Sequence, residues 1–216
     1  MPNEPISPRK TPRQSRSRDT VEAILGAAAR VLARESLEGF NTNRVAEMAG
    51  VSVGSVYQYF PNKDALMAAL IERAQDALAG EVEAVVGKTE GLPLEAALKA
   101  VAKTIVEQQY GTPRLAAAID REEVRLPVAA VLIAGEMRLL EATSRLLGHH
   151  ESELTGLDRS RAARDCLVIT KALVEADVGS ERPPPQDLAD RIVRALLGYL
   201  RGPARDGRDR PGSSPR

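Results

Sequence analysis

Cysteine and histidine are scarce in this sequence of 216 residues, and their scarcity excludes several kinds of chemistry. The single cysteine, Cys166, cannot form a disulfide within the chain, and its neighbours Leu167 and Ile169 favour a buried apolar side chain over a reactive thiol. The two histidines, His149 and His150, are adjacent, so on a helix their imidazoles point about 100° apart. A usual zinc site needs more ligands than these, and we expect no metal ion.

Residues able to support catalysis are equally hard to assemble. Glu151 and Glu153 follow the two histidines, yet histidine near a helix C-terminus is explained more simply by its favourable interaction with the helix dipole. The sequence yields no convincing Ser-His-Asp set, glycine-rich phosphate loop or Cys-His pair. We therefore expect neither an enzyme nor a bound cofactor.

Long hydrophobic stretches are missing as well. The sequence contains no run of eighteen apolar residues, whereas a membrane-spanning helix needs about 20. The basic, proline-rich N-terminus is not followed by the apolar stretch of a secretory signal. We expect a cytoplasmic protein with no membrane partner.

The residues that the chain does contain favour helices throughout. Apolar residues make up 43% and charged residues 28% of the chain, and most positions are Ala, Leu, Val, Arg or Glu, which favours helix over strand. Apolar periodicity, together with glycine and proline punctuation, predicts an all-α fold of about nine helices. The expected ranges are 19–39, 42–50, 52–60, 62–84, 93–110, 112–125, 127–148, 158–178 and 184–201.

The first four predicted helices begin with recognisable capping residues. Asp19 and Glu22 match a capping box, and Thr42, Ser52 and Asn62 are residue types that cap helix N-termini. We expect these residues to start the helices in which they lie.

Composition and charge divide the chain into four segments. Residues 1–18 and 202–216 are rich in proline, glycine, serine and charged residues, and we expect both to be disordered. Residues 19–64 form a small three-helix module, and residues 65–201 form a larger helical domain. The net charge is zero, but residues 1–63 hold nine basic and six acidic side chains, a net of +3, which leaves −3 for the remainder. This asymmetry is typical of a chain that meets phosphate at one end only.

The basic residues of the N-terminal segment have two interpretations that the sequence leaves open. They lie along DNA phosphates or in a minor groove, as basic arms do beside DNA-binding modules, or they form a solubilising tail. In the C-terminal segment the second interpretation is favoured, because Asp206 and Asp209 offset Arg205, Arg208 and Arg210. The N-terminal residues concerned are Arg9, Lys10, Arg13, Arg16 and Arg18.

The second and third predicted helices are the most informative part of the sequence. A helix of about eight residues, a three-residue turn and a second helix form a helix-turn-helix, whose second helix fits the major groove of DNA. Ala46 is small enough for the contact between the helices, Gly50 permits a left-handed turn, and Val51 and Val56 fill the core between them. The side chains expected to point outward are Ser52, Val53, Ser55, Tyr57, Gln58 and Tyr59, and Gly54 allows the backbone to approach DNA closely.

Aromatic residues are concentrated in the same place. The chain has six Phe and Tyr residues and no Trp, and Tyr57, Tyr59 and Phe60 lie within four consecutive positions. A core needs only one of them. The others favour a DNA-binding surface over the alternative, an ordinary helical hairpin with a solvated outer face.

The run from Thr42 to Leu66, TNRVAEMAGVSVGSVYQYFPNKDAL, resembles the signature of the TetR family of transcription regulators, and the resemblance covers about residues 19–75. Ser55-Val56 departs mildly from it, because many members carry Thr or Ser followed by Leu. Val53 cannot hydrogen-bond a base, so specificity there would come from methyl contacts or DNA shape. The resemblance implies phosphate anchoring by Thr42 and Lys63, backbone contacts by Tyr57 and Tyr59, base contacts by Val53, Gly54 and Ser55, and added contacts by Asn43 and Arg44.

The same resemblance implies a homodimeric repressor that binds a palindromic operator in double-stranded DNA and is released by a small-molecule effector. The helices near 158–178 and 184–201 would form the dimer interface. Each carries an apolar stripe that we expect to be available to a partner: Cys166, Ile169, Thr170, Leu173 and Val174 on the first, and Leu188, Ile192, Ala195, Leu196, Tyr199 and Leu200 on the second.

Residues of the effector pocket are harder to identify. Gln108, Gln109, Tyr110 and Met137 are candidates, because they place polar, aromatic or deformable groups on helices suited to line a cavity. The alternative, that they fill core or surface positions, stays open. For the whole chain the rival function is a helical adaptor that binds protein, in which the helix-turn-helix is structural. Salt separates the two functions, because DNA binding weakens steeply as salt rises.

Overall fold

The structure is a computed structural model that describes residues 15–154, 156–178 and 186–202. Within these ranges the chain is all-helical and contains nine helices, which confirms the predicted fold class and helix number. No helix there is both long enough and apolar enough to cross a membrane. The helices are α1 (Ser15–Gly39), α2 (Thr42–Ala49), α3 (Val53–Tyr59), α4 (Lys63–Lys88), α5 (Leu94–Gly111), α6 (Pro113–Arg125), α7 (Ala129–His149), α8 (Arg159–Val178) and α9 (Leu188–Leu200).

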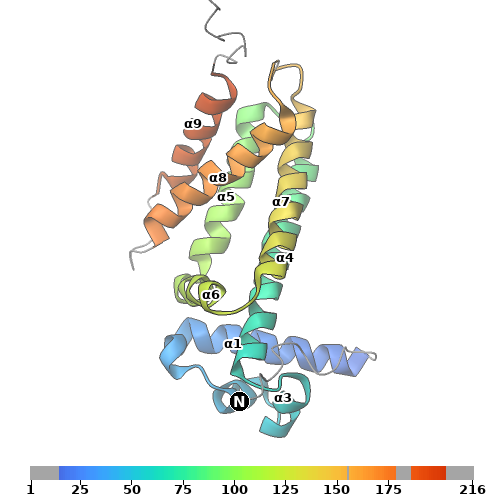
Figure 1. Ribbon diagram of the computed structural model, residues 1–216, viewed down its shortest axis with the longest axis vertical. Coiled ribbons are helices and arrows are strands. Elements are labelled where there is room, and N and C mark those ends of the chain that lie inside the picture. Colours follow the sequence, from blue (N-terminus) through green and yellow to red (C-terminus); the bar gives the residue numbers. More distant parts are fainter. Residues whose placement is uncertain (1–14, 155, 179–185, 203–216) are drawn as a thin grey trace, which may run out of the picture.

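The helices form an N-terminal head and an elongated helical body (Figure 1). Helices α1 to α3 and the first turns of α4 make up the head, at the lower end of Figure 1. The long α4 continues out of the head and runs beside α7, while α5, α8 and α9 pack together in the upper part. Helix α6 lies between the two parts and contacts α1 of the head and α5 of the body.

Two clusters of buried apolar side chains correspond to these two parts. The head cluster includes Val31, Val56 and Phe60, and α6 adds Ala118 and Ile119 to it. The body cluster is built from the second half of α4 and from α5, α7, α8 and α9. Because α4 and α6 contribute to the head cluster, the head core extends beyond the residues 19–64 assigned to the small module.

Three helix boundaries differ by more than two residues from the sequence-based expectation. Helix α1 begins at Ser15 instead of Asp19, so four residues assigned to the disordered arm are helical, and the predicted capping box is not its start. Helix α4 continues past Gly87 to Lys88. Helix α9 begins at Leu188 instead of residue 184, and the proline at 185 accounts for part of this difference, because its ring disfavours a helical conformation in the residue before it. Residues 1–14 and 203–216, predicted to be disordered, lie outside the described residues.

The apolar stripes of α8 and α9 do not point where the sequence-based interpretation placed them. Cys166 and Val174 of α8 and Leu188, Ile192 and Leu196 of α9 are buried within the chain itself. Helix α9 packs against α5, and α8 packs against α7. This packing removes the apolar side chains of the body cluster from water within a single chain. These buried side chains are therefore not available to a partner chain.

Candidate DNA-binding site

The cap of α2 is Asn41, not Thr42 as predicted. The Asn41 side chain accepts a hydrogen bond from the backbone N–H of Arg44 at 3.0 Å, which satisfies one of the free donors of the first turn. Thr42 is instead the first helical residue, and its hydroxyl lies 3.2 Å from the Tyr57 hydroxyl of α3. The sequence did offer the signal, because asparagine is as good a cap as threonine and lies three residues before Arg44.

The turn between α2 and α3 has the predicted geometry. Gly50 adopts a left-handed conformation with φ of 69°, and its N–H closes the last turn of α2 on the carbonyl of Glu47. Ser52 caps α3 by accepting the Ser55 N–H at 3.0 Å. Ala46 and Val56 are buried between the helices, whereas Val51 is only partly buried against the same cluster. Helices α2 and α3 thus form a helix-turn-helix, and α3 packs against the head cluster through the side that carries Val56.

Replacing Gly50 with alanine should lower the free energy of unfolding by about 1 kcal/mol, because non-glycine residues are strained in the left-handed region. The added methyl group meets no atom within 4 Å, so only backbone strain opposes it. Gly87→Ala is the matched control: that glycine is helical and equally open, so alanine there should stabilise by up to about 1 kcal/mol. Urea unfolding of both variants measures the difference, and equal effects would contradict the conformational argument.

The outer face of α3 is exposed and chemically mixed. Tyr57 is 44% exposed and Val53 36% exposed, and Gly54 and Gln58 are also exposed. The hydroxyls of Ser52 and Ser55 lie 2.8 Å apart at the start of the helix. Hydroxyl, amide, aromatic and methyl groups are the kinds of group that contact phosphates, base edges and thymine methyls in the major groove.

Tyr59 lies differently from Tyr57. Its side chain is partly buried against the head cluster, and its hydroxyl lies 3.0 Å from the Ser17 hydroxyl at the start of α1. Tyr59 therefore joins α3 to the first turn of α1 rather than projecting freely from the outer face.

Basic side chains border the helix-turn-helix at two helix starts. Arg44 pairs with Glu35 at 2.5 Å and with Glu47 at 2.6 Å, and its hydrogen bond holds the pKa of the Glu35 carboxyl below its usual value. Asn62 caps α4 by accepting the Ala65 N–H at 2.7 Å, as predicted. The exposed Lys63 that follows lies 5.4 Å from the centre of the Phe40 ring. Asn43 is exposed beside Arg44 at the start of α2.

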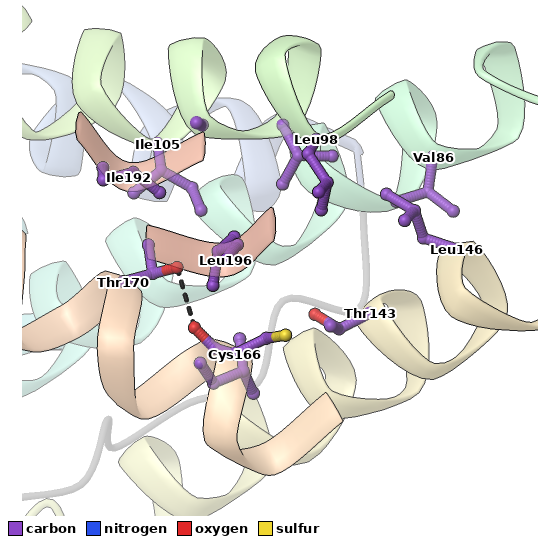
Figure 2. Close-up of a pocket in the computed structure, with 12 residues that line it drawn as sticks. Val86, Leu98, Ile105, Thr143, Leu146, Cys166, Thr170, Ile192 and Leu196 are labelled. Atoms are coloured by element: carbon purple, nitrogen blue, oxygen red, sulfur yellow. Dashed lines mark hydrogen bonds between the residues drawn. The ribbon is translucent and has the colours of Figure 1, made fainter. Parts of the chain in front are cut away.

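The body contains a small apolar cavity of about 30 Å³ between α4, α5, α7, α8 and α9 (Figure 2). It has room for about two molecules the size of water. The hydroxyl of Thr170 donates to the carbonyl of Cys166 and that of Thr143 to the carbonyl of Leu139, both at 2.8 Å, so each hydroxyl can accept a hydrogen bond from a ligand but cannot donate one without giving up its present bond. Other walls are aliphatic, among them Leu98 and Ile192.

Cys166 lines this cavity and is buried, as predicted for a small apolar side chain. Burial, with a smaller effect of the Asp165 carboxylate, raises the pKa of its thiol to about 12. A thiol with such a high pKa contains almost no thiolate at neutral pH, so it is a poor nucleophile.

The four candidate effector residues lie elsewhere. Met137 is 57% exposed on α7. Gln108 donates to Glu81 at 2.5 Å and Gln109 donates to Asp120 at 3.3 Å. The partly buried Tyr110 donates to the carbonyl of Val174 at 3.4 Å. The aliphatic residues that do line the cavity carried no signal in the sequence, because they have the same spacing as ordinary core positions.

His149 is the last residue of α7, at the helix C-terminus where the sequence placed it. His150 follows, is buried, and its Nδ1 lies 3.0 Å from Oε1 of Glu153. Among the described residues, no group of three or more His, Cys, Asp or Glu side chains is arranged to hold a metal ion.

Solved structures of regulators share this fold. A TetR transcription regulator from Haloarcula marismortui matches with a TM-score of 0.69 at 18% identity, over 85% of this chain and 97% of that chain. The fatty acid degradation regulator FadR from Bacillus halodurans gives 0.69 at 20% identity, over 89% and 99%. SmeT, the repressor of the Stenotrophomonas maltophilia multidrug efflux pump SmeDEF, gives 0.63 at 21%, over 92% and 98%. At these identities the likeness concerns the fold alone.

Sequence relatives cover a smaller part. The nucleoid occlusion factor SlmA from Haemophilus ducreyi is 30% identical over 130 residues, which is 56% of this chain and 62% of that protein. SlmA from Actinobacillus pleuropneumoniae is 31% identical over 101 residues, 45% of this chain and 48% of that protein. The chain thus matches less than two thirds of the length of these relatives.

Family models match both parts of the molecule. The model of bacterial regulatory proteins of the tetR family matches residues 24–70, which hold the helix-turn-helix. The model of the tetracyclin repressor-like C-terminal domain matches residues 93–200, from the loop before α5 to the end of α9. Since the second match alone spans half of the chain, and the first coincides with the head, this chain belongs to the TetR family of DNA-binding transcription regulators.

Proposed function

We propose that the chain is a transcriptional repressor that binds a palindromic operator as a homodimer and leaves it when a small molecule binds the body. The observation that carries the proposal is the exposed outer face of α3. Tyr57 and Gln58 project from it, although Val56 of the same short helix is fully buried. A helix that presents such a face beside a capped turn is suited to the major groove.

Phosphate contacts are expected on both sides of α3. The Thr42 and Tyr57 hydroxyls lie together at the N-terminus of α2, where free backbone N–H groups favour a phosphate. Lys63 occupies the equivalent position at the start of α4. Arg44 can join them by exchanging a carboxylate partner for a phosphate, because its side chain is 43% exposed.

The proposed dimer interface is the outer face of α8 and α9. Val168 of α8 is 61% exposed, and Ala172 lies one turn further along the same face. On α9 the exposed Gly198 has nothing within 4 Å of the position that a Cβ would occupy. Small residues let two helices approach closely, and an interface shared by two identical chains requires a two-fold axis. The operator would then be a palindrome.

The effector is expected to enter the body by widening the apolar cavity. The cavity walls carry no charged side chain, and Thr143 and Thr170 supply the polar atoms beside it. An uncharged, largely apolar molecule suits such walls, because a charged group would lose its hydration there without gaining a partner.

The test is binding of the purified protein to labelled DNA from the region flanking its own coding sequence, measured by fluorescence anisotropy at two salt concentrations. Tyr57→Ala and Gln58→Ala should each weaken specific binding about 5- to 150-fold, since one good contact contributes about 1–3 kcal/mol. Gln108→Ala is the matched control, because Gln108 is an exposed glutamine on α5, outside the head. It should bind as the parent does.

The salt response separates the regulator from its rival, the helical adaptor. Specific binding that weakens steeply with salt supports contacts to phosphate. If no flanking fragment is preferred over random DNA and Tyr57→Ala behaves like the parent, the repressor proposal is wrong. The helical adaptor that binds protein is then the better hypothesis.

A further inference from the structure

The guanidinium of Arg44 is held by two carboxylates that come from different helices. Its Nε donates to Oε1 and Oε2 of Glu35 on α1, at 3.1 and 3.3 Å, and its Nη2 donates to Oε1 of the same residue at 2.5 Å. Its Nη1 donates to Oε2 of Glu47, about one turn further along α2, at 2.6 Å. Glu35 therefore occupies one whole edge of the guanidinium, whereas Glu47 occupies a single nitrogen.

The two carboxylates also differ in their exposure to water. The Glu35 side chain is 28% exposed and joins α1 to α2, whereas the Glu47 side chain is 69% exposed and belongs to the same helix as Arg44. An exposed ion pair contributes little to stability, because water and salt screen it. A two-point contact between a carboxylate and a guanidinium is stronger and more directional. Glu47 is thus the partner that another anion can replace.

The position of Glu35 is determined by a break in α1. Ser36 has φ of 58° and ψ of −168°, a backbone conformation that is costly for residues other than glycine and persists only where the surrounding structure holds it. The carbonyl of Arg34, on the other side of Glu35, accepts a hydrogen bond from Nη1 of Arg114 at 3.0 Å. Both neighbours of Glu35 are therefore constrained, which keeps its carboxylate at the start of α2.

Arg44 lies where the proposed function places a DNA phosphate. It shares the first turn of α2 with Thr42, whose hydroxyl lies 3.2 Å from that of Tyr57, and the free N–H groups of a first turn favour a phosphate. A guanidinium has five N–H donors, and Glu35 uses those of Nε and one of Nη2. Once Glu47 has moved away, the edge formed by Nη1 and Nη2 can make two parallel hydrogen bonds to a phosphate.

We propose that Glu35 positions Arg44 for a backbone phosphate of the operator, and that Glu47 competes with this phosphate for the guanidinium. Glu35 is a positioning residue, because it acts through Arg44 and not by contact with DNA. The inference rests on the proposed function, since it needs α2 and α3 to lie on the duplex. It assigns opposite effects on DNA affinity to two carboxylates that contact the same side chain.

Glu35→Gln and Glu47→Gln are compared in the full-length chain by fluorescence anisotropy with the same labelled flanking DNA. Each variant removes one negative charge near the proposed DNA surface, so long-range electrostatics alone would strengthen binding in both. Positioning predicts instead that Glu35→Gln weakens binding roughly 3- to 10-fold, because Arg44 loses its support and with it a phosphate contact. Glu47→Gln should strengthen binding about 1.5- to 5-fold, the amount that an exposed ion pair contributes.

The salt response and a second background separate positioning from a loss of folding. A phosphate contact contributes about 0.9 to the slope of log affinity against log salt, so Glu35→Gln and Arg44→Gln should each lower that slope by up to about 0.9 per protomer. In the Arg44→Gln background, Glu35→Gln should cause no further weakening. A weakening that persists there would show that Glu35 acts on the fold of the head and not through Arg44, and would overturn the inference.

The signs of the two effects decide between the inference and simple repulsion. If Glu35→Gln strengthens binding as Glu47→Gln does, both carboxylates merely repel DNA and the positioning role is wrong, although loss of specific binding in Tyr57→Ala would still support the repressor. If Glu47→Gln weakens binding, Glu47 supports Arg44 and does not compete with phosphate. If the parent prefers no fragment over random DNA, the proposed function fails, and the inference fails with it.

Discussion

Phe60→Ala is expected to lower the free energy of unfolding by about 3–5 kcal/mol, the usual result of removing a buried phenylalanine ring. Phe60 is 1% exposed and belongs to the head cluster together with Val56 and Phe40. Its N–H also closes the last turn of α3 on the carbonyl of Val56 at 2.8 Å. Since the ring lies where α3 passes into α4, its loss opens a cavity beneath the DNA-reading helix.

Tyr57→Ala on the same helix is the control. Tyr57 is 44% exposed, and its removal should change the free energy of unfolding by about 1 kcal/mol or less. Urea unfolding followed by circular dichroism gives both values. Both variants should lose DNA binding, but only the phenylalanine variant should lose stability with it. A stability loss below about 1 kcal/mol for Phe60→Ala would show that the head closes over the missing ring and that its core is not packed as described.

These two side chains show what the sequence could predict. Helix α3 has only seven residues, between the cap at Ser52 and the proline after Phe60. In so short a helix, the position of the apolar Val56 determines which side faces inward. Gly50 was predictable for the same reason, because a left-handed turn at that point is a local requirement. Local rules thus located the helix-turn-helix to within about a residue. The one difference is the cap of α2, which is Asn41 and not the predicted Thr42.

Contacts between distant segments could not be predicted in this way. Nothing in the order of residues pairs Ser17 with Tyr59 or shows that α6 reaches into the head cluster. The apolar stripes of α8 and α9 were visible, but periodicity states only that a face is buried and not which neighbour buries it. For this reason the assignment of those stripes to a partner chain was wrong. The sequence also does not show which polar side chains lie beside a cavity, so the candidates for the effector pocket had no such support.

Helix α6 provides a further long-range connection, between head and body. Arg125 at its C-terminus donates to both carboxylate oxygens of Asp64, at 2.6 and 3.3 Å, across 61 residues of sequence. The same guanidinium donates to Glu122 at 2.5 and 2.8 Å. Asp64 belongs to the first turn of α4 and follows the proposed phosphate anchor Lys63 in the sequence. Arg125 therefore ties the end of α6 to the base of the head.

Arg125→Met should lower the free energy of unfolding by about 1–3 kcal/mol. Methionine keeps most of the aliphatic stem, so the loss comes from Glu122, whose side chain is only 10% exposed and would be left without its guanidinium partner. Asp64→Asn should cost less, about 0.5–1 kcal/mol, because that side chain is 40% exposed and water screens the pair. Urea unfolding of the two single variants and the double variant gives the coupling energy between Arg125 and Asp64.

The coupling energy should also depend on pH. The Arg125 guanidinium, through its hydrogen bonds, lowers the pKa of the Asp64 carboxyl in the folded chain. A lowered folded pKa contributes stability above the unfolded value of about 4 and loses it as pH falls through the folded value. The coupling measured at neutral pH should therefore decline toward zero in acid. A coupling that persists when Asp64 is protonated would mean that packing of the arginine stem, and not the ion pair, joins Arg125 to Asp64.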